Sequence, residues 1–251
     1  MQPMRGMPVD IRAVAALLLL LLSKSLCHGQ GEGTRLSSRL AIGVKVSALG
    51  AGLEAATPFS RRANLRAGFN AFGLDLRFHR DGIPYSGQLS FHSVEAHYDW
   101  FPFYGSFHIS PGVLVYNGNR LNARVSIPAS QSFTLNHTPY VSDAAKPVNG
   151  TGSLNFPRAG PMISIGWGNL LPRNGTHFTI PFEVGAVYTG PPLARLNLAG
   201  AVCDSSGTNC RNFAADPILQ SNVQGENNRL NRLLSPFRFY PLISVGFGFS
   251  F

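Results

Sequence analysis

The sequence predicts an all-β protein folded as a single antiparallel transmembrane β-barrel, and three observations lead to this prediction. Beyond residue 39 the apolar residues recur at every second position, as they do in a strand with one apolar face. The chain is 44% hydrophobic but only 13% charged, and this charged share is about half that of a typical soluble domain. Its 27 Gly and 18 Pro residues supply many turns. Short strands that face lipid account for all three observations.

The clearest alternation covers the C-terminal residues 239–251. Aromatic and aliphatic side chains, among them Phe247, Phe249 and Phe251, fall on one face, and mostly Ser and Gly fall on the other. A soluble β-sandwich also alternates, but it places charged residues opposite its apolar face, and no charged residue follows Arg238. The segment therefore predicts a tilted membrane strand of about ten residues. A soluble sandwich is the alternative architecture.

Upstream segments with the same period bring the predicted number of strands to about twelve, with ten as the alternative count. An even number brings both ends of the barrel to the same side of the membrane. The break at Ala48-Leu49-Gly50 is read as a tight turn or a bulge, and a slip of the pattern at Gly73 is attributed to a β-bulge. The predicted strands lie near residues 39–48, 49–57, 65–77, 87–100, 104–116, 121–129, 132–140, 151–157, 162–169, 177–188, 193–203 and 238–251.

Short and long connections alternate between these strands, as the periplasmic turns and outer loops of transmembrane barrels do. The short ones are predicted at residues 58–62, 102–105, 158–161 and 190–192, and the long ones at 79–86, 117–120, 142–150, 170–176 and 204–236. Within the last long connection, residues 214–234 have rough helical spacing, which predicts either a short amphipathic helix or a disordered polar loop.

The N-terminal residues 1–29 predict a secretory signal peptide, so residues 30–251 would form the barrel. Basic residues precede an apolar run at 13–22, which is too short to cross a bilayer as a helix. A lipidated Cys27 is the alternative. Cys203 and Cys210 then remain, and an oxidising compartment favours a disulfide between them over a redox or metal pair.

Ten residues are predicted to line the lumen, because charges facing lipid would cost about 2–4 kcal/mol near the membrane centre. They either form a salt-bridge network that fills a narrow barrel or set the selectivity of a polar pore. Three of them on one strand face are also a candidate acid–base or metal cluster, namely Glu95, His97 and Asp99. The ten are Lys45, Glu54, Arg66, Asp75, Arg77, Glu95, His97, Asp99, Glu183 and Arg195.

No other motif predicts an enzyme, a metal site or a cofactor. P-loop, dinucleotide-binding, H-E-x-x-H and G-x-S-x-G patterns are absent from the sequence. His108 and Ser110 share a strand face, but Phe107 and Ile109 would take the lipid side, which turns this pair inward. The formal charge of +9 is scattered along the chain, without the basic runs interleaved with aromatics that bind nucleic acid.

The signal peptide, the alternating strands and the terminal Phe251 make the chain resemble bacterial outer-membrane β-barrel proteins as a class. The resemblance implies a location in the outer membrane, contact with its lipid, and recognition by the barrel-assembly machinery. It also implies that Phe247, Phe249 and Phe251 are the assembly signal. The sequence thus predicts a narrow pore or a structural barrel, and the alternatives are a surface-interaction protein acting through its outer loops or a lipid-modifying enzyme.

Overall fold

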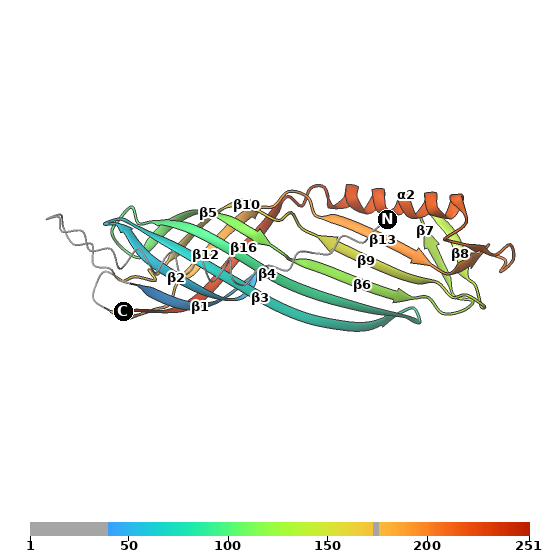
Figure 1. The fold of residues 1–251 in the computed structure, drawn as a ribbon, viewed down its shortest axis with the longest axis horizontal. Coiled ribbons are helices and arrows are strands. Elements are labelled where there is room, and N and C mark those ends of the chain that lie inside the picture. Colours follow the sequence, from blue (N-terminus) through green and yellow to red (C-terminus); the bar gives the residue numbers. More distant parts are fainter. Residues whose placement is uncertain (1–39, 173–175) are drawn as a thin grey trace. The chain divides into compact units, whose positions relative to one another are not determined.

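Eight antiparallel strands of the computed structural model close into a barrel, within the described residues 40–172 and 176–251. Around the ring they follow the order β1, β2, β3, β4, β5, β10, β12 and β16, and β16 pairs with β1 to close it (Figure 1). The predicted signal peptide lies outside the described residues. The barrel strands are β1 (Ala41–Ser47), β2 (Gly50–Ser60), β3 (Ala63–Arg80), β4 (Ile83–Trp100), β5 (Phe107–Asn117), β10 (Gly160–Trp167), β12 (Phe182–Tyr188) and β16 (Phe239–Ser250).

The two ends of the barrel differ. At the end that we call proximal, β1 begins at Ala41 and β16 ends at Ser250, which are direct partners. At the opposite, distal end, Ser47 pairs with Gly50 across a tight turn between β1 and β2, so the tight turn is the correct one of the two alternatives that the sequence left open there. Within the described chain, no helix is long and apolar enough to cross a membrane.

The remaining strands belong mainly to a distal extension of the barrel. β6 (Arg120–Ser126), β9 (Asn149–Asn155) and β13 (Leu193–Ala199) continue the sheet from the distal half of β4. β7 (Ser132–Leu135), β8 (Thr138–Ser142), β14 (Ala201–Cys203) and β15 (Arg211–Asn212) form a second small sheet, and β11 (Phe178–Thr179) is a short strand beside β16.

The prediction of about twelve strands, or of ten, is therefore wrong for the barrel itself, which has eight in the described chain. The strands predicted near 121–129, 151–157 and 193–203 exist but lie in the extension, because alternation has the same period whether an apolar face meets lipid or a protein core. The turns predicted at 158–161 and 190–192 are wrong as well. There the chain passes between the extension and the barrel (Figure 1).

β3 and β4 run through both parts of the fold, and their apolar face changes sides between them. The two strands pair continuously from Ala63↔Trp100 to Arg80↔Ile83, without the bulge predicted at Gly73. In the barrel, β3 turns Leu65 and Phe69 outward and the neighbouring polar side chains inward. Beyond Ala71 the inward positions become apolar and the outward positions polar. On β4 the inward Ile83 and Tyr85 reach a protein core, whereas the inward apolar side chains of β3 stay exposed from Phe72 to Phe78.

The inner face of the extension packs on a hydrophobic core. The core joins the extension sheet, the second sheet and the helix α2 (Pro217–Leu234). Of the two alternatives predicted for 214–234, the helix is therefore correct and the disordered loop is wrong. Asp216 caps the helix by accepting from the N–H groups of Ile218 and Leu219. The hydrogen bond from Leu219 is the main cause that lowers the pKa of Asp216. The core residues are Ile83, Ile127, Leu135, Val148, Val202, Phe213 and Leu219.

The helix also covers the free edge of the extension sheet. Asn231 accepts from the N–H of Ala194 at 2.8 Å and donates to its carbonyl at 3.0 Å. One helical turn earlier, Asn227 makes the same two contacts with Leu196, at 2.6 and 3.0 Å. Two side-chain amides thus satisfy backbone groups of β13 that an edge strand would leave open to another chain.

The predicted disulfide joins Cys203 to Cys210 at the end of the extension. In the loop between them Asp204 accepts from the side chains of Ser206 and Asn209 and from the N–H of Thr208. These hydrogen bonds, that of Ser206 first, hold the pKa of Asp204 well below its usual range. The bridge and the carboxylate together order a polar loop.

Candidate functional site

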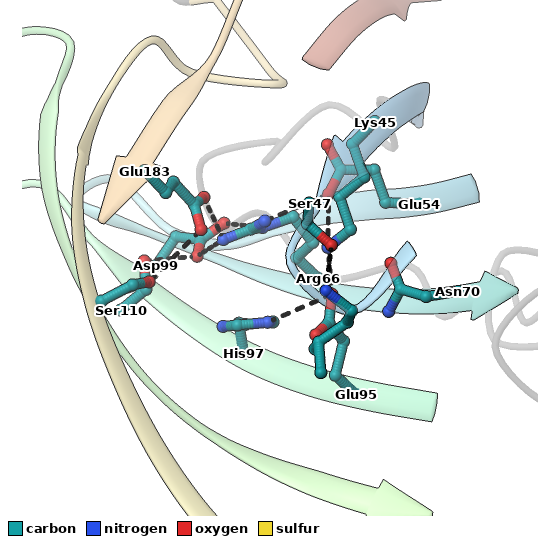
Figure 2. A network of polar contacts seen from close by, with 12 residues as sticks. Lys45, Ser47, Glu54, Arg66, Asn70, Glu95, His97, Asp99, Ser110 and Glu183 are labelled. Carbon is teal, nitrogen blue, oxygen red and sulfur yellow. Dashed lines mark hydrogen bonds and ion pairs between the residues drawn. The ribbon is translucent and has the colours of Figure 1, made fainter. Parts of the chain in front are cut away.

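The barrel encloses a cluster of charged side chains, which we call the lumen network (Figure 2). The structure places seven of the ten predicted lumen residues there, all buried: Lys45, Glu54, Arg66, Glu95, His97, Asp99 and Glu183. They come from five strands, because each sits at an inward position of β1, β2, β3, β4 or β12.

The prediction is wrong for Asp75, Arg77 and Arg195. All three are exposed on the extension, outside the barrel. The parity argument assumed that apolar side chains face outward along the whole length of each strand. Apolar side chains do face outward where the strand meets lipid. Where the outer face meets water, polar side chains take the outward positions instead.

Arg66 lies at the centre of the lumen network. Its Nε and Nη2 donate to the two carboxylate oxygens of Asp99, both at 2.9 Å, in the two-pronged geometry that suits a guanidinium. Its Nη1 lies 3.1 Å from Oε2 of Glu54, and its Nη2 lies 2.5 Å from Oε1 of Glu183. One cation therefore contacts three carboxylates from three other strands (Figure 2).

Lys45 extends the network toward β4. Its Nζ contacts Oε1 of Glu95 directly and lies 3.5 Å from Oε2 of Glu54. Because Glu54 also contacts Arg66, the two cations belong to one continuous network. The imidazole of His97 is adjacent, with its Nε2 3.7 Å from Oε1 of Glu95.

Three polar residues outside the ten predicted lumen residues complete the network. Ser110 on β5 donates to Asp99 at 2.6 Å, and Ser164 on β10 donates to Glu183 at 3.2 Å. The imidazole Nε2 of His108 lies 3.2 Å from Glu183. The alternation along β5 already predicts that His108 and Ser110 face inward, and this is the signal that assigns them to the lumen. Polar contacts thus link the inner faces of seven strands.

Two cations and four carboxylates leave the network with two excess negative charges while His97 and His108 are neutral. Side chains of the network are at most 7% exposed, so each charge depends on its protein partners rather than on bulk water.

An apolar layer closes the lumen on the distal side of the network. Its residues come from the turn between β1 and β2 and from inward positions of β5, β10, β12 and β16, and Tyr240 packs against them. The hydroxyl of Tyr240 donates to the carbonyl of Ala48 in that turn. The layer consists of Leu49, Leu114, Met162, Val187 and Leu242.

A second apolar layer closes the proximal side. Leu170 and Leu171, in the connection after β10, insert between Ala41 and Ala56. Leu170 fits because Gly43 and Gly248 lack a side chain; a Cβ at these positions would lie 2.9 and 2.3 Å from its Cδ1. The long connection predicted at 170–176 is therefore partly a plug at the proximal end rather than an outer loop.

Asn169 fastens this plug. Its Oδ1 accepts from Nδ2 of Asn64 on β3 at 2.8 Å and from the N–H of Leu171 at 2.9 Å. A side chain at the inner wall of the barrel thereby holds the connection in place.

The candidate acid–base or metal cluster does not have the geometry of either kind of site. The carboxylates of Glu95 and Asp99 already contact Lys45 and Arg66. Among the described residues, the one trio of His, Cys, Asp or Glu side chains close enough to share a metal is Asp143 with Cys203 and Cys210. Both of its sulfur atoms are in the disulfide.

No protein-family model and no curated protein matches the sequence. Solved structures resemble the fold. The crystal structure of Acinetobacter baumannii CarO is 18% identical, covers 86% of this chain and 99% of its own, and superposes with a TM-score of 0.53. Acinetobacter baumannii CarO2 is 17% identical, covers 85% of this chain and 99% of its own, with a TM-score of 0.57. The antiparallel barrel fold that the sequence predicted is thus the fold of these solved proteins.

Proposed function

We propose that the chain is an integral protein of a bacterial outer membrane, built as a structural barrel with a filled lumen. The observation that carries this proposal is a belt of exposed apolar side chains on the outer surface of all eight barrel strands. The belt lies at the same level along the barrel as the buried charges. A soluble protein would not leave such a surface in water. Members of the belt include Ile42, Val44, Leu53, Leu65, Phe69, Trp100, Val113, Ile163, Ile165, Phe182, Val184, Ile243 and Val245.

The aromatic side chains at the two ends of the belt also fit a membrane. Trp100 and Trp167 are exposed on its proximal side, and Tyr188 and Phe239 pair their rings on its distal side. Amphipathic aromatic rings prefer the head-group level of a membrane. The proximal end carries the connections after β2 and β4, the start of β1 and the end of β16, and it then lies on the periplasmic side. The distal end and the extension lie outside.

Of the two functions predicted for the barrel, the filled lumen favours the structural one over the narrow pore. Water and ions would have to pass an apolar layer, the lumen network and a second apolar layer, and each fills the interior between the strands. The barrel then serves as a membrane anchor that holds the extension at the cell surface.

No catalysis belongs to this proposal. His108 and Ser110 are at most 2% exposed and contact carboxylates in the lumen. A lipid-modifying enzyme would need these side chains on the outer surface, within reach of an acyl chain.

We expect the protein to be folded in the outer-membrane fraction and to conduct no ions. Unboiled protein should migrate differently from boiled protein in detergent gels, since a closed barrel resists the detergent until it is heated. The same unboiled preparation should give no conductance steps in planar bilayers. Steady steps from folded protein would restore the narrow pore, and a soluble protein without a mobility shift would contradict the barrel in a membrane.

We further propose that Phe247, Phe249 and Phe251 form the signal that the barrel-assembly machinery reads. β16 is the strand that closes the barrel between β1 and β12, and the N–H of Phe251 donates to the carbonyl of Leu40 at 3.0 Å. The ring of Phe251 is 63% exposed, so it contributes little to packing.

Replacement of Phe251 with alanine should therefore reduce the amount of heat-modifiable protein in cells several-fold. The free energy of unfolding of the purified, refolded barrel, measured by urea titration, should stay within about 0.5 kcal/mol of wild type. The matched variant Phe251→Tyr keeps an aromatic ring and should assemble normally. Equal assembly of the alanine and tyrosine variants would show that the terminal ring is not the signal.

A further inference from the structure

The outward face of the extension sheet is polar and basic. It carries the exposed arginines Arg77 on β3, Arg120 and Arg124 on β6, and Arg195 on β13. Around them the cross-strand partners are mostly Ser, Thr, Asn and Gln, from β4, β6 and β9. We call this surface the basic face.

The register of the strands shows that these residues share one face. Ser86 on β4 pairs with both Arg77 and Arg124, so these two arginines lie on either side of it, about 10 Å apart across the sheet. Arg120 lies on the same face of β6, two outward positions away from Arg124, and pairs with Ser90. Two or more guanidinium groups can therefore reach the same extended ligand.

The four arginines have no carboxylate partner in the part of the chain that the structure describes. No ion pair within the described residues involves any of them. Asp75 is the single carboxylate on the face, and it lies in the row between Arg77 and Arg120. A surface with free guanidinium groups among hydroxyl and amide side chains is complementary to phosphates attached to sugars, since guanidinium binds phosphate through two parallel hydrogen bonds.

The basic face also lies next to the lipid-facing part of the barrel, at the level expected for lipid head groups. β3 and β4 pass from barrel to extension without a bulge, so Arg77 projects on the same side as the lipid-facing Leu65 and Phe69. The polarity changes at Ala71↔His92. Arg120 is level with Gly73, roughly 7 Å along the strand beyond this change, and Arg77 is roughly 20 Å beyond it.

We propose that the basic face binds the phosphorylated sugar head groups of lipopolysaccharide in the outer leaflet beside the barrel. The proposal rests on the proposed function, because it requires the distal side of the barrel to face outward. The arginines bind the phosphates, and the Ser, Thr, Asn and Gln side chains exchange hydrogen bonds with sugar hydroxyls. The extension is thereby held against the membrane surface through its outer face.

Binding is tested with the full mature chain folded in zwitterionic detergent micelles, titrated with purified lipopolysaccharide while the melting temperature is followed. Lipopolysaccharide should raise the melting temperature of the wild type, and added salt should weaken the effect. The double variant Arg120→Gln/Arg124→Gln should bind roughly thirtyfold more weakly. Lipopolysaccharide stripped of phosphate should bind the wild type as weakly as intact lipopolysaccharide binds this variant.

The matched control removes two exposed arginines at the proximal end, in the variant Arg61→Gln/Arg62→Gln. This control should bind like the wild type. Equal weakening in the two double variants would overturn the proposal, because it would show a general attraction of positive charge. If the protein still shows the heat-dependent gel shift but does not bind lipopolysaccharide, the proposed binding is also contradicted. The proposed membrane barrel is not affected by that result. Loss of the gel shift in the wild type would instead contradict the proposed function.

Discussion

Replacing Arg66 with methionine is expected to lower the free energy of unfolding by about 3–5 kcal/mol. The guanidinium contacts Glu54, Asp99 and Glu183, and methionine would leave these carboxylates without their shared cation. Water cannot compensate, since the lumen network is closed by apolar layers on both sides. Urea titration of the barrel folded in lipid vesicles, followed through the fluorescence of its two tryptophans, measures the loss.

Two further variants separate charge from geometry. Arg66→Lys keeps the positive charge but cannot make the two-pronged contact with Asp99, so its loss should be smaller than that of the methionine variant. Arg77→Met removes an exposed arginine from the same strand and should change stability by no more than about 0.5 kcal/mol. If Arg66→Met and Arg77→Met unfold at the same urea concentration, the lumen network does not stabilise the barrel.

The barrel and most of its lumen network could be predicted from the sequence, because both depend on local alternation. Lys45, Glu54 and Arg66 each stand between apolar neighbours in segments that meet lipid. There the cost of exposing a charge to lipid leaves a single direction for the side chain. The same rule applied to β5 also turned His108 inward.

The number of barrel strands could not be predicted in this way, because alternation does not distinguish lipid from a protein core. β3 illustrates the problem: its apolar residues shift from odd to even positions at Phe72 while its pairing with β4 continues unbroken. A bulge and a passage out of the membrane produce the same pattern in one strand. The observation that separates them is that β4 shifts at the partner of the same residue, Phe91, which only the register reveals.

The proximal plug could not be predicted for a different reason. Leu170 and Leu171 lie in a short polar context that is typical of a loop. Their burial depends on Gly43 and Gly248, which are distant in the sequence and become neighbours only when β16 pairs with β1. Contacts of this kind arise from the closure of the barrel and leave no local signal.

Replacing both Asn227 and Asn231 with alanine is expected to release α2 from the edge of β13. The double variant loses four hydrogen bonds to the backbone of Ala194 and Leu196, which should lower the local stability of the helix by about 2–4 kcal/mol. Amide hydrogen exchange in α2 should accelerate accordingly. The gel shift of the barrel should be unchanged, because the helix contacts the extension and contributes no residue to the lumen network.

The control is Asn228→Ala, which changes a neighbouring exposed asparagine whose side chain accepts a hydrogen bond from Gln224 of the same helix. Its exchange rates should match those of the wild type. Uncovering β13 exposes backbone donors and acceptors to other chains, so the double variant should also aggregate through the extension at concentrations where the control remains monodisperse. Equal exchange in the two variants would mean that apolar packing through Leu219 and Val223 holds the helix, and that the asparagines only satisfy an edge already covered.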